Sequence, residues 1–146
     1  MDFPFFKSRC LICWKSFEVP RARDSMNMTK IYFEKRIKTF GYYTWPTNKI
    51  VEDDVIDFLS LNQKLQIEND NSKGNAVYRL IGFIADGDWE VVLGFNRCPR
   101  CGIKLNHISN APSLTNEVDE LRFDNFLGLD RIHHQEELFK KTINGR

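Results

Sequence analysis

The four cysteines of the chain are the residues best suited to chemistry, and they fall in two pairs with the same spacing. Cys10 and Cys13 form the first pair, and Cys98 and Cys101 form the second. Two cysteines three positions apart on a tight turn can place both sulfurs on one metal ion, and zinc takes four such ligands in a tetrahedron. The two pairs therefore predict one zinc ion in a closed, structural site, because no coordination position stays open for a substrate.

The residues around the second pair suit a metal-binding turn. Pro99 fixes a backbone angle between the two cysteines, and Gly102 can adopt the left-handed conformation that closes the turn. The first pair differs, since Leu11 and Ile12 lie between its cysteines and Trp14 follows them. The first turn therefore lacks both proline and glycine.

Residues 95–105 resemble the zinc knuckle of zinc-ribbon and rubredoxin-like proteins, because Phe95 precedes the motif Cys98-Pro99-Arg100-Cys101-Gly102. The resemblance covers only this stretch and residues 10–13. It implies that residues 10–13 form the partner knuckle and that the cofactor is one structural Zn²⁺. The 84 residues between Cys13 and Cys98 are more than a simple ribbon needs, so we expect a helical insertion over about residues 20–75.

Two other chemistries could use the same cysteines. Cys98-Pro99-Arg100-Cys101 resembles the Cys-Pro-x-Cys active site of glutaredoxins, where the motif follows the first strand and opens a helix. Here the motif lies late in the chain, and Gly102 is a poor residue to open a helix. An iron–sulfur cluster can also use four cysteines, but the knuckle form favours zinc.

Basic side chains surround both cysteine pairs and have two interpretations. Cations compensate the charge of a four-thiolate site and lower thiol pKa values, which favours metal binding. The same side chains could instead contact phosphate or an acidic protein. In that case we expect Arg9, Lys15, Arg97 and Arg100 to bind the partner. The full set is Lys7, Arg9, Lys15, Arg97, Arg100 and Lys104, with Glu18 as the acid nearby.

The remaining polar clusters are weaker candidates for a site. His107, His133 and His134 contain no His-x-x-x-His pair, and the last two are expected on the surface of a helix. The acids of residues 52–57 are expected to form the solvated first turns of a helix, where the helix dipole favours negative charge. The sequence has no Walker loop, no dinucleotide-binding glycine motif and no nucleophile elbow.

Length and composition indicate a single globular domain over residues 1–146. Hydrophobic residues make up 42% of the chain and Phe occurs 12 times, which is ample for a core. No stretch approaches the roughly 20 apolar residues of a membrane span, and the N-terminus lacks the features of a signal peptide. These features favour a cytoplasmic location, where paired cysteines are more often ligands than disulfides.

The hydrophobic pattern predicts an α+β fold with a small β-hairpin and about four α-helices. An N-terminal strand leads to Cys10. The hairpin comprises residues 76–85 and 89–96 around a turn at 86–88, and it runs into the second knuckle. Residues 42–46 form an aromatic connector that packs in the core. The helices are expected at residues 29–40, 49–66, 115–127 and 130–143, with loops at 20–28, 68–75 and 106–113.

The sequence favours a non-enzymatic protein that binds a protein partner, since the metal site is closed and no catalytic constellation is present. In size and style it is similar to small inhibitors and toxin-neutralising immunity proteins of bacteria and phages, without a diagnostic motif. One alternative is a nucleic-acid-binding regulator that adds Lys30, Lys35, Arg36 and Lys38 to the basic residues around the knuckles. The near-neutral net charge of +1 means that only a local patch could attract nucleic acid. A second alternative is a thiol–disulfide oxidoreductase.

Overall fold

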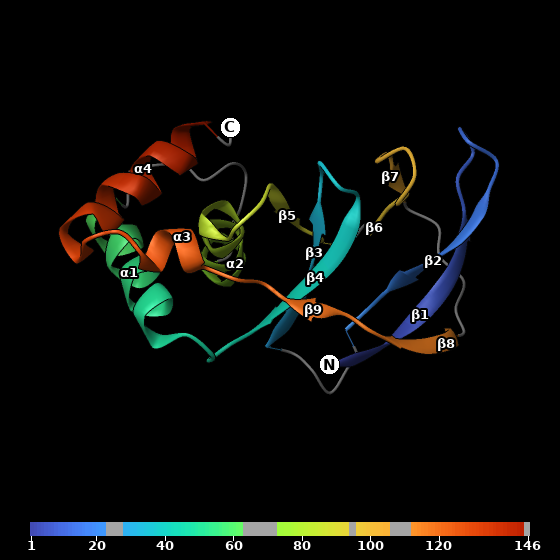
Figure 1. Cartoon of the computed structure of the whole chain (residues 1–146), viewed down its shortest axis with the longest axis horizontal. Helices are drawn as coiled ribbons and strands as arrows, with labels where there is room; N and C mark the ends of the chain where they lie inside the picture. The colour runs from blue at the N-terminus through green and yellow to red at the C-terminus, as the bar shows by residue number, and fades with distance from the viewer. Residues whose placement is uncertain (23–27, 63–72, 94–95, 106–111, 145–146) are drawn as a thin grey trace.

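The computed structural model describes residues 1–22, 28–62, 73–93, 96–105 and 112–144. It has the mixed α+β architecture that the sequence predicts, with strands gathered at one end and helices at the other (Figure 1). The two cysteine pairs lie among the strands. None of the described helices is long and apolar enough to cross a membrane.

The first sheet and a short ribbon make up the strand end. In the sheet, β1 (Asp2–Arg9) lies between β2 (Ser16–Pro20) and β8 (Pro112–Glu117) and is antiparallel to both. The ribbon pairs β6 (Asn96–Arg97) with β7 (Lys104–Leu105). The strand β1 confirms the predicted N-terminal strand that leads to Cys10.

The second sheet crosses the middle of the molecule (Figure 1). Its strand order is β5 (Trp89–Val91), β3 (Thr29–Glu34), β4 (Thr39–Thr44) and β9 (Asp119–Glu120). The strand β9 is parallel to β4, and the other pairs are antiparallel.

The helix predicted over residues 29–40 is wrong, because this segment forms β3 and the start of β4. Tyr32 and Tyr43 enter the core under the helices, whereas Ile31 and Tyr42 enter a second core that also contains Phe3 of β1. The sheet is therefore buried on both faces, and aromatic and β-branched side chains suit such a position. Of the residues that gave the helical spacing, Phe33 and Phe40 face each other across the pair of β3 and β4, and Ile37 lies in the turn between these strands, where it is 71% exposed.

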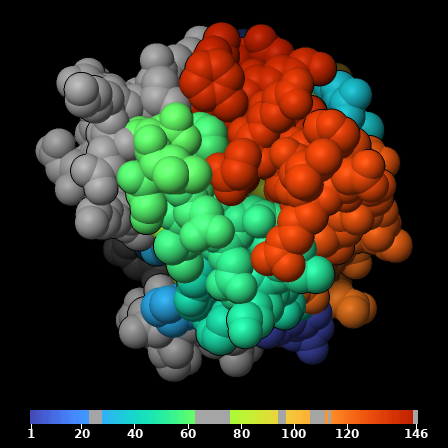
Figure 2. All heavy atoms as spheres, turned by 90° about the vertical axis from the view of Figure 1, so that its left-hand side faces the viewer, coloured from blue at the N-terminus to red at the C-terminus, as the bar shows by residue number. Residues whose placement is uncertain are grey.

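The helical end contains α1 (Lys49–Leu61), α2 (Lys73–Ile84), α3 (Asp124–Leu127) and α4 (His134–Asn144), and a 3₁₀ turn (Arg131–His133) precedes α4. The first and last of these helices confirm the predictions over residues 49–66, as far as the chain is described, and over residues 130–143. Figure 2 shows α1 and α4 packed against each other on the face opposite the knuckles.

Two more element predictions are wrong. Residues 76–85 belong to α2 rather than to a strand, because Ala76, Leu80 and Ile84 recur at a spacing of four and are all buried. The helix predicted over residues 115–127 is replaced by the end of β8, by β9 and by α3. The turn at residues 86–88 is present, but it joins α2 to β5 instead of two strands.

The helical insertion expected over about residues 20–75 is helical only in part, since it also contains β3 and β4. Of the predicted loops, residues 23–27, 68–72 and 106–111 lie outside the described residues. Residues 73–75 begin α2 and residues 112–113 begin β8.

The largest apolar core lies between the helices and the second sheet. Phe58, Leu80 and Leu138, from three different helices, are at most 1% exposed there. The buried Tyr32 hydroxyl donates a hydrogen bond to the carbonyl of Tyr78 at 2.6 Å, which satisfies its polar atom. Tyr42 and Tyr43 are buried, and Trp45 packs against the core under the helices. The predicted core packing of residues 42–46 is therefore confirmed for these aromatic side chains.

Candidate metal centre

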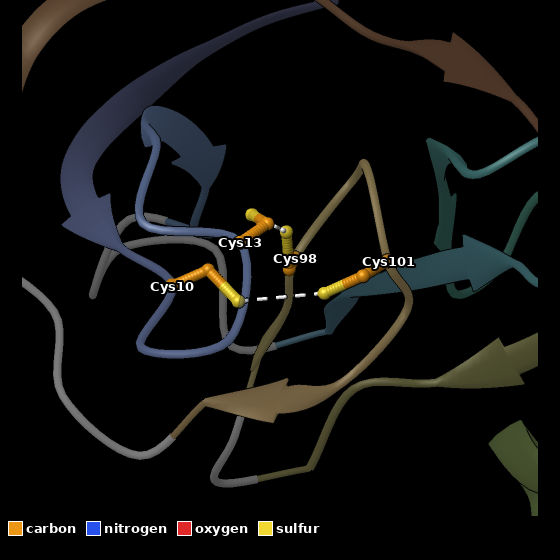
Figure 3. Close-up of side chains that lie close together, drawn as sticks. All are labelled: Cys10, Cys13, Cys98 and Cys101. Carbon is orange, nitrogen blue, oxygen red and sulfur yellow. Dashed lines mark hydrogen bonds between the residues drawn. The ribbon is translucent and has the colours of Figure 1, made fainter.

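The two cysteine pairs occupy two turns that face each other (Figure 3). Cys10 and Cys13 lie in the turn between β1 and β2, and Cys98 and Cys101 lie in the turn between β6 and β7. Cys10 and Cys98, the first cysteine of each pair, are fully buried, whereas Cys13 and Cys101 are partly exposed. The antiparallel pair of β1 and β2 holds the first turn, and the pair of β6 and β7 holds the second turn. These two strand pairs thus position all four thiols.

The backbone hydrogen bonds of the two turns are the same. In the first turn the N–H of Trp14 donates to the carbonyl of Cys10 at 2.8 Å, and the N–H of Cys10 donates to the carbonyl of Lys15 at 3.2 Å. In the second turn the N–H of Gly102 donates to the carbonyl of Cys98 at 2.8 Å. The N–H of Cys98 donates to the carbonyl of residue 103 at 2.9 Å. The first turn therefore has the knuckle form although it lacks the proline and glycine of the second.

The residue after each pair adopts a left-handed backbone conformation. Gly102 has φ of 75°, which glycine adopts without strain, and Trp14 has φ of 60°. A bulky side chain is a conformational outlier in this region. Trp14 therefore takes the place of the knuckle glycine, and its indole is 68% exposed.

The positions of the four sulfur atoms fit a single tetrahedral metal ion. All four Sγ atoms lie within 4.8 Å of one another. The Sγ atoms of Cys10 and Cys101 are 3.4 Å apart, and those of Cys13 and Cys98 are 3.7 Å apart (Figure 3). Sulfurs about 2.3 Å from a central zinc ion are about 3.8 Å apart, whereas disulfide sulfurs are about 2.05 Å apart. The cluster thus matches the spacing of metal ligands.

The two buried thiols differ in acidity. Hydrogen bonds from the backbone N–H of Cys13, aided by Ile12 and by the neighbouring thiols, lower the pKa of Cys10 to about 6 in spite of burial. Burial raises the pKa of Cys98 to about 11, although the backbone N–H groups of Cys101 and Arg100 act in the opposite direction. Metal ligation requires thiolates, and a divalent cation supplies the charge that ionises a buried thiol.

The apolar packing around the cysteines is small. Leu105 is the one large aliphatic side chain buried beside Cys10 and Cys98 in the described chain, and the half-buried Phe17 packs against this cluster. So few apolar contacts cannot by themselves order two turns, so the knuckles need an additional source of stability.

The four basic residues expected to bind a partner have different surroundings. Arg97 donates to both carboxylate oxygens of Glu90, at 2.5 and 2.9 Å, and to the carbonyl of Gly102 at 2.6 Å. It therefore anchors the second knuckle to β5. Arg9, Lys15 and Arg100 are exposed.

The expectation that His134 lies on a helix surface is wrong. Its Nδ1 lies 2.6 Å from the Asp54 carboxylate, its Nε2 lies 3.2 Å from the carbonyl of Leu129, and its ring stacks on Phe126. Both ring nitrogens have partners, and the pair joins α1 to α4. The signal in the sequence was the spacing of four that His134 shares with the buried Leu138 and Thr142.

The acids at the start of α1 are likewise not simply solvated. Glu52 is 4% exposed and Asp54 is 5% exposed. The Glu52 carboxylate accepts hydrogen bonds from the Tyr43 hydroxyl and from the N–H of Thr47 at 2.7 Å. Glu52 therefore fixes the entry into α1, whereas Asp54 joins α1 to α4. His107 lies outside the described residues, and His133 is exposed.

No protein-family model, curated protein or solved structure matches the chain. A function must therefore be argued from the geometry of the site.

Proposed function

We propose that this is a non-enzymatic binding protein of the inhibitor or toxin-neutralising type, in which one zinc ion held by the four cysteines clamps the two knuckles together. A single observation carries the proposal. Leu11, Ile12 and Trp14 are 70%, 65% and 68% exposed on the first knuckle, whose backbone is tightly hydrogen bonded. We call these three side chains the apolar tip.

Zinc is the ion that best suits four thiol ligands in this arrangement. Thiolates are soft ligands that select zinc over hard cations such as magnesium and calcium. Four protein ligands leave no position for a substrate or for water, so the ion contributes folding free energy rather than reactivity. Reduced thiols also suit the cytoplasm, which we propose as the location.

The apolar tip has the properties of a protein-binding anchor. Three large apolar side chains lie close together on a short turn, and burying them against a partner is favourable by roughly 25 cal/mol for each Å² removed from water. Trp is among the residues that contribute most to protein interfaces. Because the turn is already ordered by its hydrogen bonds, binding loses little backbone entropy.

The charge beside the tip indicates the chemistry of the partner. Arg9 and Lys15 are exposed on either side of the first cysteine pair, and Arg100 is exposed on the second knuckle. A partner with an apolar pocket edged by acidic side chains would complement this surface. We leave Arg97 out of the surface because Glu90 and Gly102 already hold its guanidinium group.

The backbone of Trp14 supports the same assignment. A left-handed tryptophan costs about 1–2 kcal/mol relative to a right-handed conformation. Strained residues of this kind concentrate at functional sites. The conformation leaves Trp14 68% exposed in the free protein, so we assign its role to a bound partner.

The first test measures metal and thiol chemistry. We expect one zinc per chain by elemental analysis and no dithiol reductase activity, since all four thiols are metal ligands. A metal-free protein that reduces disulfides would reject the clamp and support the oxidoreductase alternative.

The second test measures partner capture with matched variants. A Trp14→Ser/Ile12→Ser variant should lose a stoichiometric partner from the native host, with affinity reduced by at least about tenfold. The control is Ile132→Ser, which changes an 83% exposed residue at the helical end. Equal capture by both variants, or no stoichiometric partner with the unaltered protein, would contradict the proposal.

A further inference from the structure

A basic groove at the helical end has no role in the metal centre or in the apolar tip. It has two lobes with volumes of about 280 and 320 Å³, which share Gly87, Glu137 and Lys141. One wall is α4, and the other walls are the turn that follows β3, the end of α2 with the turn after it, and α3. The groove thus joins segments that are far apart in the sequence.

Cations from two segments, the turn after β3 and the helix α4, line this groove. Arg36 and Lys141 line the first lobe, and Lys35, Lys140 and Lys141 line the second. Lys38, in the same turn as Lys35, reaches the second knuckle, where its Nζ donates to the carbonyl of Arg100 at 2.8 Å. We call the four cationic side chains that line the lobes the basic strip, namely Lys35, Arg36, Lys140 and Lys141.

The central turn of the strip is held rigidly by a buried carboxylate. Glu34 is 3% exposed, and it accepts hydrogen bonds from the N–H groups of Arg36 at 2.9 Å, Ile37 at 3.2 Å and Asp88 at 3.2 Å. The N–H of Lys35 also donates to the carbonyl of Asp88 at 2.9 Å. The cations therefore project from an ordered platform, which lowers the entropy lost when they bind a ligand.

The acids along the strip only partly offset these cations. Asp88 lies 3.5 Å from Lys35, the Glu34 carboxylate lies 3.7 Å from the Arg36 guanidinium group, and Glu137 lines both lobes. Asp86 is occupied in accepting hydrogen bonds from the N–H groups of Asp124 and Asn125 at 3.0 Å each. The position of Lys140 and Lys141 near the C-terminus of α4 also suits the helix dipole, but that explanation does not extend to the cations of the β3–β4 turn.

We propose that the basic strip binds the phosphate backbone of a nucleic acid. The cations are spread along the groove instead of enclosing one site, so they suit an extended polyanion better than a single phosphate ion. Phe83 and the half-buried Trp89 line the second lobe beside these cations, and aromatic rings next to cations suit the bases and phosphates of a nucleic acid. The proposal is independent of the protein-binding role proposed above.

The test measures the binding of a labelled single-stranded RNA by fluorescence anisotropy at salt concentrations between about 50 and 200 mM. The strip variant carries Lys35→Gln, Arg36→Gln, Lys140→Gln and Lys141→Gln. If these four side chains contact phosphates, affinity should fall at least about tenfold at low salt. The slope of log affinity against log salt should shrink by about 3, since each phosphate contact contributes roughly 0.7 for a single strand.

A control variant removes four exposed cations outside the strip and leaves the same net charge, namely Lys7→Gln, Lys49→Gln, Arg122→Gln and Arg131→Gln. It should bind the RNA within about twofold of the unaltered protein at the same salt. A double variant, Lys140→Gln/Lys141→Gln, changes only the exposed face of α4 and repeats the test at lower risk to the fold.

Three results would overturn the proposal. The unaltered protein does not bind the RNA at low salt, or the control variant loses as much affinity as the strip variant. The third result is binding of polyglutamate of matched length to the strip as tightly as the RNA. This result would indicate an acidic protein as the partner of the strip.

Discussion

The knuckle end and the helical end of this molecule are stabilised by different forces. Among the residues that the structure describes, sixteen buried ones form the core under the helices, whereas three form the cluster at the cysteines, and two of those three are themselves cysteines. Apolar burial can therefore order the helices but not the knuckles. The proposed metal is therefore a local requirement of the knuckle end rather than a stabiliser of the whole molecule.

Removal of the metal should have the largest effect, and it should be confined to the knuckle end. Cys98→Ser should abolish zinc binding, because a structural site contributes on the order of 10 kcal/mol. Amide hydrogen exchange should accelerate in residues 4–20 and 96–105, while α1, α2 and α4 retain protection. Simultaneous loss of protection in the helices would show that the two ends unfold as one unit.

A large-to-small substitution in the helical core should destabilise the helical end and leave metal binding at the knuckle end unchanged. Phe58→Ala removes a ring that is 1% exposed, and it should lower the free energy of unfolding by about 3–5 kcal/mol. Zinc content should stay at one per chain, since the thiols lie at the other end. Ile56→Ala, on the same helix at a 43% exposed position, is the control and should cost less than about 1 kcal/mol.

High pH should likewise destabilise the helical end. Burial raises the pKa of Tyr32, Tyr43 and Tyr78 above the ordinary value of 10.0, and nearby tyrosines or acids raise it further. Because the folded state holds these protons more tightly, the associated stability is complete below pH 10.0 and is lost as the pH rises further. The near-ultraviolet tyrosinate signal should therefore appear late and together with loss of helix. Free titration at the ordinary pKa in the folded protein would contradict this account.

The pair of Asp54 and His134 should matter less than the core but more than any surface charge. Asp54→Asn replaces a charged acceptor that lies 2.6 Å from the imidazole, and it should destabilise the protein by about 2 kcal/mol. Asp57→Asn alters an exposed acid on the same helix and should change stability by less than about 0.5 kcal/mol. Thermal denaturation of both variants gives the comparison, and equal melting temperatures would refute a special role for the pair.

The sequence predicted the site better than the fold, for a physical reason. Each four-residue turn fixes its own pair of thiols locally, so the spacing of Cys10, Cys13, Cys98 and Cys101 was sufficient to predict that they meet in a cluster that could hold a metal. Long-range packing decides whether Tyr32 and its neighbours form a strand or a helix, and their local apolar spacing fitted a helix although they form β3. The buried pair of Asp54 and His134 was missed because burial of a charge depends on a partner 80 positions away.

The difference between the two knuckles gives the smallest and most discriminating prediction. Trp14→Gly relieves the left-handed conformation, so it should raise stability or zinc affinity by up to about 1 kcal/mol, although glycine also gains entropy in the unfolded chain. Ile12→Gly, in the same turn but without a positive φ, should instead lower stability. Gly102→Ala should be destabilising by about 1 kcal/mol, because its strain is purely conformational and a Cβ there would meet no atom within 4 Å. If Trp14→Gly tightens the knuckle and yet loses the partner, the tryptophan serves binding at the expense of stability. A knuckle that is weakened by this change would mean that the indole supports the fold and is no anchor.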